Sequence, residues 1–178
     1  MICQEQFNGW LLDVSTYGEG VILWVKTVNE QRIVEILDEF HPEFFAVPRK
    51  KTGSDFKRFK EILEGHPNVT RVRICEKYVK LEDHKKRKIL GVSVAKPAVF
   101  KKTIQEVNKI GLFTLYNTDL PISQMYFYVN DIFPMSLCSF RTKAVKGKNN
   151  KSIMKLASLE LNDDNEELFY DLPPLKAI

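Results

Sequence analysis

The sequence predicts an α+β fold, and two patterns in its apolar residues support that prediction. Most segments up to residue 118 either alternate apolar and polar residues or form short β-branched runs, as strands do. Two further segments carry apolar residues at helical spacing, so the middle of the chain has the order strand, helix, strand, strand, helix, strand. That order is typical of a ferredoxin-like (βαββαβ) subdomain, whose helices cover one face of a four-stranded antiparallel sheet.

Residues 1–40 predict a small antiparallel β-meander that precedes this subdomain. The runs GWLLDVS and GVILWVKT are apolar and rich in β-branched residues, and the glycines of TYGEG between them suit a tight turn. The run QRIVEIL, which follows VNE, is expected to add a third strand.

Residues 41–118 predict the ferredoxin-like subdomain itself. Its strands are expected at PEFFAVP, VTRVRICEKYV, KILGVSVA and LFTLYN, and its first helix at SDFKRFKEILEG. The second helix is expected from Pro97 to Gly111, because proline suits a helix start and glycine a helix end. Since strand side chains alternate between faces, Arg71 and Arg73 are expected on the face that the helices leave open, with Tyr116 as a candidate neighbour.

Residues 119–178 predict a helix, a basic loop and a strand. The helix follows Pro121 and is apolar on nearly every side. One apolar stripe consists of Ile122, Met125, Tyr126 and Val129. The basic segment RTKAVKGKNNK (residues 141–151) is expected as a solvated loop, and SIMKLASLEL as a strand. The closing FYDLPPLKAI has the pattern of a chain that enters another strand, so we expect the sequence to be a fragment of a longer protein.

Composition narrows the function classes. The chain has 178 residues, of which 44% are hydrophobic and 28% charged, and no apolar run approaches the roughly 18–20 residues that a membrane span needs. We therefore expect no membrane partner. The three cysteines have no close spacing, which favours a reduced, cytoplasmic setting over a disulfide framework. A net charge of +4 permits polyanion binding without demanding it.

A search for catalytic motifs finds none. No glycine-rich phosphate loop and no CxxC or HxxxH pair is present. His41, His66 and His84 lie near predicted turns, where capping or surface roles are expected. Two kinds of non-enzymatic protein remain as hypotheses: a domain whose sheet binds single-stranded nucleic acid, and a sensor or interaction domain. No segment matches the sequence motif of RNA-recognition modules.

Four segments resemble, in the right order, the N-terminal domain of family B DNA polymerases: GWLLDVSTYGEGVILWV, FHPEFFAV, LYNTDLPISQMYFYVNDIFPM and YDLPPLKAI. The closest resemblance is to the second B-type polymerase lineage of archaea and some bacteria. It covers nearly the whole chain, although residues 52–88 match by pattern only. TDLPISQMYFY and DLPPLKAI are the specific blocks.

The resemblance implies that this domain contacts single-stranded template DNA and supports the exonuclease domain of the same parent chain. It implies no catalytic residue and no cofactor here, because the exonuclease Asp-x-Glu would begin beyond Ile178; the parent would use a divalent metal, Mg²⁺. In the family, the helix after residue 121 lies against the exonuclease and polymerase domains. Phe127, Tyr128 and Phe133 are therefore candidates for a domain interface, and the alternative is a helix central to this domain alone.

The resemblance also implies a pocket that senses a template base in archaeal members of the family. By position, its residues would be Thr16, Tyr17, Pro42, Glu43, Pro97, Phe100, Leu120, Pro121 and Ile122. The sequence departs from the family pattern at Glu43, Phe100 and Ile122. A phenylalanine at 100 could fill the cavity, and a carboxylate at 43 would repel phosphate, so a structural role is the alternative.

Basic residues of the middle segment are the candidate phosphate contacts. They are Arg71, Arg73, Lys85, Lys86, Arg87 and Lys88. Two alternatives to the polymerase hypothesis stay open: a free-standing module that binds single-stranded nucleic acid, and an interaction domain without nucleic-acid affinity.

Overall fold

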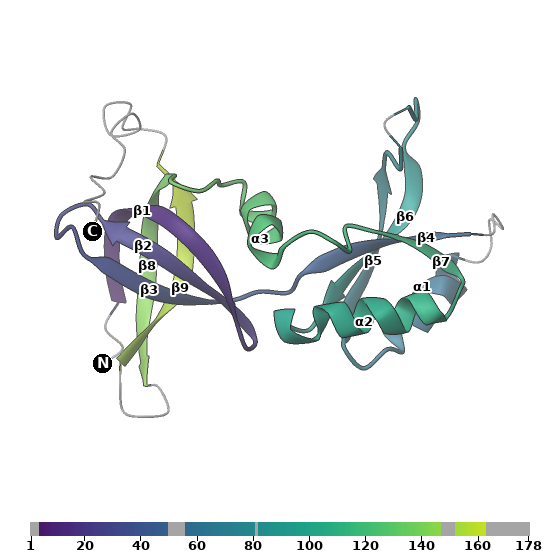
Figure 1. The fold of residues 1–178 in the computed structure, drawn as a ribbon, viewed down its shortest axis with the longest axis horizontal. Helices are drawn as coiled ribbons and strands as arrows, with labels where there is room; N and C mark the ends of the chain where they lie inside the picture. Colours follow the sequence, from purple (N-terminus) through teal and green to yellow (C-terminus); the bar gives the residue numbers. More distant parts are fainter. Residues whose placement is uncertain (1–3, 50–55, 81, 147–151, 163–178) are drawn as a thin grey trace. The chain divides into compact units, whose positions relative to one another are not determined.

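The computed structural model describes residues 4–49, 56–80, 82–146 and 152–162, and Figure 1 shows them as a mixed α+β chain rich in strands. The chain divides into two compact units. The first comprises Met1–Glu39 with Ile122–Ile178, and the second comprises Phe40–Pro121. The predicted segments 1–40 and 119–178 therefore fall almost entirely into one unit, and the second unit nearly coincides with the predicted segment 41–118.

The first unit is built on a closed five-stranded barrel with the strand order β1-β2-β3-β9-β8. Neighbouring strands are antiparallel except β3 and β9, which are parallel. The strands are β1 (Gln4–Tyr17), β2 (Gly20–Thr27), β3 (Ile33–Glu39), β8 (Leu137–Lys146) and β9 (Ser152–Leu161). Alternate residues fill the interior, and Leu11, Leu23, Ile36 and Phe140 have no exposed surface.

The predicted three-stranded meander is present as β1, β2 and β3, but these strands belong to a larger barrel and do not form a subdomain of residues 1–40. A three-stranded sheet leaves two edges with unpaired backbone groups, and β8 and β9 pair with both of them. The prediction of a basic loop is also wrong from Arg141 to Lys146, which belong to β8. Phe140 and Thr142 are buried there while Arg141 and Lys143 are exposed, so the basic residues occupy the outer face of a strand. The rest of that predicted loop lies outside the described residues.

The second unit has the element order that the sequence predicted. Its elements are β4 (Glu43–Pro48), α1 (Phe56–Glu64), β5 (Val69–Lys77), β6 (Arg87–Val94), α2 (Pro97–Lys109) and β7 (Phe113–Tyr116). The strands form one sheet in the order β5-β6-β4-β7, with every neighbouring pair antiparallel. Figure 1 shows both helices on the same side of this sheet.

Aromatic contacts join those helices to the sheet. Phe59 of α1 meets Phe113 of β7 edge to face, with 5.5 Å between ring centroids. Phe100 of α2 meets Phe44 of β4 in the same way at 6.2 Å. Phe44 is fully buried between β4 and α2, so every second side chain of β4, counted from Phe44, faces the helices.

Helix α3 (Ile122–Asn130) belongs to the first unit and is anchored there by its buried residues Met125 and Tyr126. The Tyr126 hydroxyl donates a hydrogen bond of 2.8 Å to Asp38 of β3. The predicted apolar stripe is only partly buried, because Val129 is 67% exposed. Of the candidates for a domain interface, Tyr128 and Phe133 are exposed and Phe127 is half-buried. None of the helices within the described ranges has the length and apolar character needed to span a membrane.

Candidate nucleic-acid interface

The candidate interface is the face of the second unit's sheet that points away from α1 and α2. Phe44 and Ala46 of β4 are fully buried toward the helices. Because side chains alternate along a strand, Glu43, Phe45 and Val47 point the other way. The β5 residues that point to this same side are Arg71, Arg73 and Lys77, as the strand register shows. We call this surface the open face.

An aromatic hollow of about 320 Å³ lies on the open face. Phe45 of β4 and Tyr116 of β7 are direct cross-strand partners, so their side chains stand next to each other. The Lys77 ammonium lies 5.7 Å from the centroid of the Phe45 ring, within the range of a cation–π contact. The lining includes Phe45, Val47, Lys77, Tyr78, Ile89 and Tyr116.

Next to the hollow, Glu43 and Arg73 form a two-pronged ion pair across β6. Arg73 Nε donates to Glu43 Oε1 at 2.8 Å, and Arg73 Nη2 donates to Oε2 at 2.7 Å. These hydrogen bonds raise the pKa of the Arg73 guanidinium above its ordinary value. The pair passes over Gly91, where an added Cβ would lie 2.8 Å from Glu43 Oε1. Arg73 and Glu43 therefore neutralise each other, so Glu43 does not present an uncompensated negative charge to phosphate.

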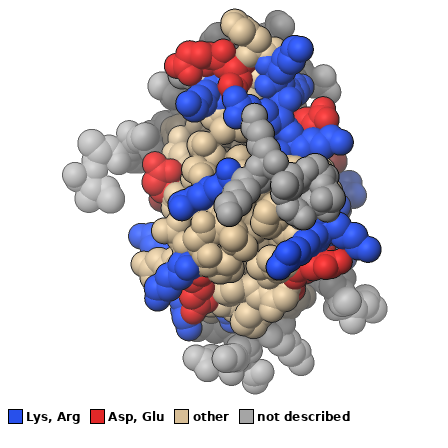
Figure 2. All heavy atoms as spheres, turned by 90° about the vertical axis from the view of Figure 1, so that its right-hand side faces the viewer, with Lys and Arg blue, Asp and Glu red and all other residues tan. Residues whose placement is uncertain are grey.

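The six predicted phosphate contacts do not form one patch. Three of them, Arg71, Arg73 and Arg87, lie on the open face. Lys88 is the next residue along β6, so its side chain points to the side covered by the helices. Arg87 is held by Asp83, with 2.8 Å between Nη2 and Oδ1. Lys86 lies over the ring of Tyr78 at 5.8 Å, and Lys85 is exposed beside it. Figure 2 shows Lys and Arg spread over one side of the molecule with Asp and Glu among them, so the charge there is mixed.

The residues predicted for a template-base pocket are divided between the two units. Thr16 and Tyr17 are exposed at the end of β1, and Ile122 begins α3, all in the first unit. Phe100 is 2% exposed and packs against Phe44 in the core of the second unit. The other second-unit members are Pro42 and Pro97, which are buried, Glu43 and Leu120, which are half-buried, and Pro121, which is exposed.

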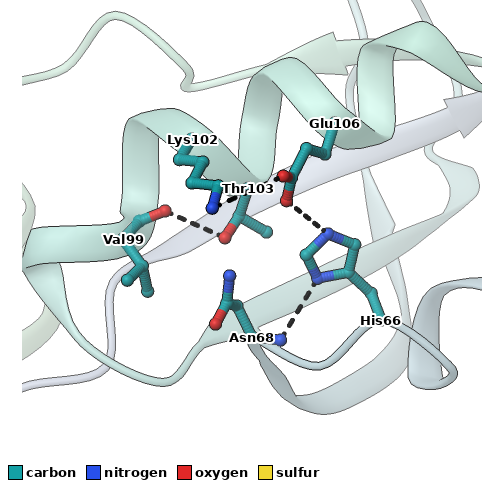
Figure 3. Close-up of polar contacts among 6 residues, drawn as sticks. All are labelled: His66, Asn68, Val99, Lys102, Thr103 and Glu106. Atoms are coloured by element: carbon teal, nitrogen blue, oxygen red, sulfur yellow. Dashed lines mark hydrogen bonds and ion pairs between the residues drawn. The ribbon is translucent and has the colours of Figure 1, made fainter.

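A separate polar cluster joins the turn after α1 to helix α2 (Figure 3). The His66 ring accepts a hydrogen bond at Nδ1 from the Asn68 backbone N–H, at 3.2 Å. Its other nitrogen, Nε2, therefore carries the proton and lies 3.0 Å from Glu106 Oε2. Thr103 is buried and donates to the Val99 carbonyl. These contacts match the turn role expected for His66, and we interpret the cluster as a structural clamp.

Replacing His66 by alanine should lower the free energy of unfolding of the second unit by about 1–2 kcal/mol, because both hydrogen bonds are lost in a half-buried site. Lys102→Ala is the control. Lys102 Nζ lies 3.9 Å from the other Glu106 oxygen, and its side chain is 71% exposed, so its loss should cost less than about 0.5 kcal/mol. Urea unfolding followed by far-ultraviolet circular dichroism measures both. Equal losses for the two variants would contradict the clamp.

Among the residues that the structure describes, no cluster of three or more His, Cys, Asp or Glu could hold a metal ion. Burial raises the pKa of the Cys138 thiol to about 12, so this cysteine stays protonated and unreactive at neutral pH. The arrangement on the open face can bind a flat or anionic group but presents no paired nucleophile and base.

Sequence reasoning placed Arg71, Arg73 and Tyr116 near the open face but missed the hollow. Its missed members are Phe45, Lys77 and Tyr78. The segment PEFFAVP could have predicted Phe45, because consecutive residues of a strand, here Phe44 and Phe45, must point to opposite faces. The pairing of Glu43 with Arg73 had no such signal, because thirty residues separate the two in sequence.

Comparison with known proteins gives a fold-level likeness. No protein-family model matches the sequence, and no curated protein matches it. Among solved structures, the chain is similar to the family B DNA polymerase from the hyperthermophilic archaeon Pyrobaculum calidifontis, with a TM-score of 0.61 and 19% identity. The match covers 85% of this chain and 20% of that polymerase. This chain therefore has a fold that recurs within about a fifth of the length of an archaeal family B DNA polymerase.

Proposed function

We propose that this chain is the N-terminal domain of a family B DNA polymerase, of the second B-type lineage, in which it contacts single-stranded template DNA. The likeness of its fold to part of an archaeal family B polymerase carries the proposal. The domain supports the exonuclease domain of the same parent and contributes no catalytic residue; the parent works in the cytoplasm with Mg²⁺ held by its other domains. The sequence resemblance at TDLPISQMYFY, within and before α3, supports the same assignment.

The physical basis for DNA contact is the open face of the sheet. In a ferredoxin-like arrangement, the helices bury one face of the sheet and the other stays available to a ligand. Single-stranded nucleic acid needs cations for its phosphates and apolar surface for its bases. The open face offers Arg71 and Lys77 together with half-buried Phe45 and Tyr116, which suits both needs.

The phosphate contacts can be tested by salt dependence. The triple variant Arg71→Ala, Lys85→Ala, Lys86→Ala removes three exposed cations from the predicted set. Each phosphate contact to a single strand contributes about 0.7 to the slope of log affinity against log salt, so the slope should become shallower by about 2. Fluorescence anisotropy of a labelled DNA strand, titrated at several salt concentrations, measures it.

A matched control variant has the same net charge as this triple variant. Lys57→Ala, Arg58→Ala and Lys101→Ala remove three exposed cations from α1 and α2, on the helix-covered side. This control should leave the slope unchanged. Identical slopes in both triple variants would refute the assignment of these phosphate contacts. Failure of the unaltered chain to bind the strand at about 50 mM salt would instead favour an interaction domain without nucleic-acid affinity.

A further inference from the structure

The charged residues of the open face do not account for the aromatic side chains that line its hollow. Its floor includes Ile89, which is 3% exposed, and its sides include the partly exposed rings of Phe45 and Tyr116. Tyr78, just after β5, is 59% exposed and adds a third ring from the far side of β6. Three aromatic side chains from separate parts of the sequence thus line one small hollow.

We propose that this hollow is a stacking site for an unpaired base of single-stranded DNA, with Lys77 placed for the adjoining phosphate. The inference rests on the proposed function and deepens it by naming the group that is bound. A nucleobase has a flat π-face that aromatic side chains bind, and the nucleotide carries one negative charge. The site offers aromatic rings and a cation side by side.

The position of Lys77 supports this assignment. Its ammonium lies 5.7 Å from the Phe45 ring centroid, and it forms no ion pair with any described carboxylate. Two other cations of the open face are already in salt bridges, Arg73 with Glu43 and Arg87 with Asp83. Lys77 lines the hollow, and a phosphate can approach it without first breaking a salt bridge.

Asn117 supplies a polar group at the edge of the hollow. It follows β7 directly and has a φ of 58°, a left-handed conformation that asparagine tolerates better than most residues. An asparagine amide both donates and accepts hydrogen bonds, which suits the edge of a base. The volume of about 320 Å³ is at the lower end of the range for small-ligand sites, as expected for a single base rather than a large ligand.

The test compares two strands that differ only in their bases. One is a thymine strand roughly twelve nucleotides long. The other has the same sugar–phosphate backbone without bases. Stacking predicts that the full chain binds the thymine strand about tenfold more tightly than the abasic strand at the same salt concentration. The variants Phe45→Ala and Tyr116→Ala should lose that preference while keeping their affinity for the abasic strand.

Two further variants separate stacking from a loss of folding. Phe45→Leu keeps an apolar side chain without the ring and should behave like Phe45→Ala, whereas Tyr116→Phe keeps the ring and should retain the preference. Tyr128→Ala removes an exposed tyrosine from α3 and should leave binding unchanged. Thermal unfolding shows which variants remain folded, and only those are compared.

The outcomes distinguish this inference from the proposed function. Equal affinity for thymine and abasic strands, with a normal salt slope, would overturn the stacking site and leave template contact standing. A preference that survives both Phe45→Leu and Tyr116→Ala would place stacking elsewhere and also overturn it. Absence of binding to either strand at low salt would overturn both. Loss of the preference in the ring-deleting variants alone supports the site.

Discussion

Replacing Gly20 by alanine is expected to destabilise the barrel by about 3 kcal/mol. Gly20 begins β2 and faces Glu39 in the β2–β3 ladder. A Cβ at this position would lie 1.9 Å from the Asp38 carbonyl oxygen and 2.9 Å from its carbon. Both atoms belong to the backbone of the neighbouring strand, so relief of the clash requires the ladder to open rather than a side chain to rotate.

Gly18→Ala is a matched control from the same turn. Gly18 has a φ of +45°, and an added Cβ would meet no atom within 4 Å. Its substitution should cost only the strain of a left-handed residue, about 1 kcal/mol. Both tryptophans of the chain, Trp10 and Trp24, lie on β1 and β2, so tryptophan fluorescence during urea unfolding reports on the barrel itself. Similar losses for the two variants would contradict the close approach at Gly20.

The second large effect is expected for Tyr126→Phe, which should cost about 2 kcal/mol at neutral pH. Tyr126 is 1% exposed, and its hydroxyl donates to Asp38 Oδ2 at 2.8 Å. Removing the hydroxyl leaves a partly buried carboxylate without this donor. The same hydrogen bond fastens α3 to β3, so the variant should also loosen the helix from the barrel.

The loss should depend on pH in a defined direction. Burial, the largest influence, raises the pKa of Asp38 above its ordinary 3.8, and the hydrogen bond from Tyr126 opposes that rise. A raised carboxyl pKa means that the folded state holds its proton more tightly, so stability is lost as the pH rises from 3.8 through the folded pKa. Without Tyr126 that pKa rises further, and the cost of the variant should be greater at neutral pH than near pH 4.

Asp38→Asn provides the control for this pH dependence. It removes the titrating group and keeps an oxygen that can accept the hydrogen bond from Tyr126. In the Asp38→Asn background, the effect of Tyr126→Phe should become independent of pH. Urea unfolding at neutral pH and at about pH 4 completes the double-mutant cycle. A pH-dependent effect that persists in this background would show that another group is responsible.

Local patterns predicted most elements of the second unit. The helices at 56–64 and 97–109 and the strands around them follow from apolar spacing and from proline and glycine at their ends. The strand at 137–146 was missed because its outer face is basic, and a run of charges resembles a loop when the buried partners between them are not considered. Buried and exposed residues do alternate in this strand, but its many basic residues made the segment resemble a loop.

The sequence by itself determined the α+β class, the order of strands and helices from β4 to β7, and the presence of basic and aromatic residues in one region. Only the tertiary structure decided the closure of the barrel, since β3 and β9 pair across more than a hundred residues, as Ile36 and Met154 do. It also decided which charges remain available, by pairing Arg73 with Glu43, and which rings meet, by placing Tyr116 opposite Phe45. Spacing within an element follows from local backbone geometry, whereas strand neighbours are chosen by burial and hydrogen bonding across the whole fold.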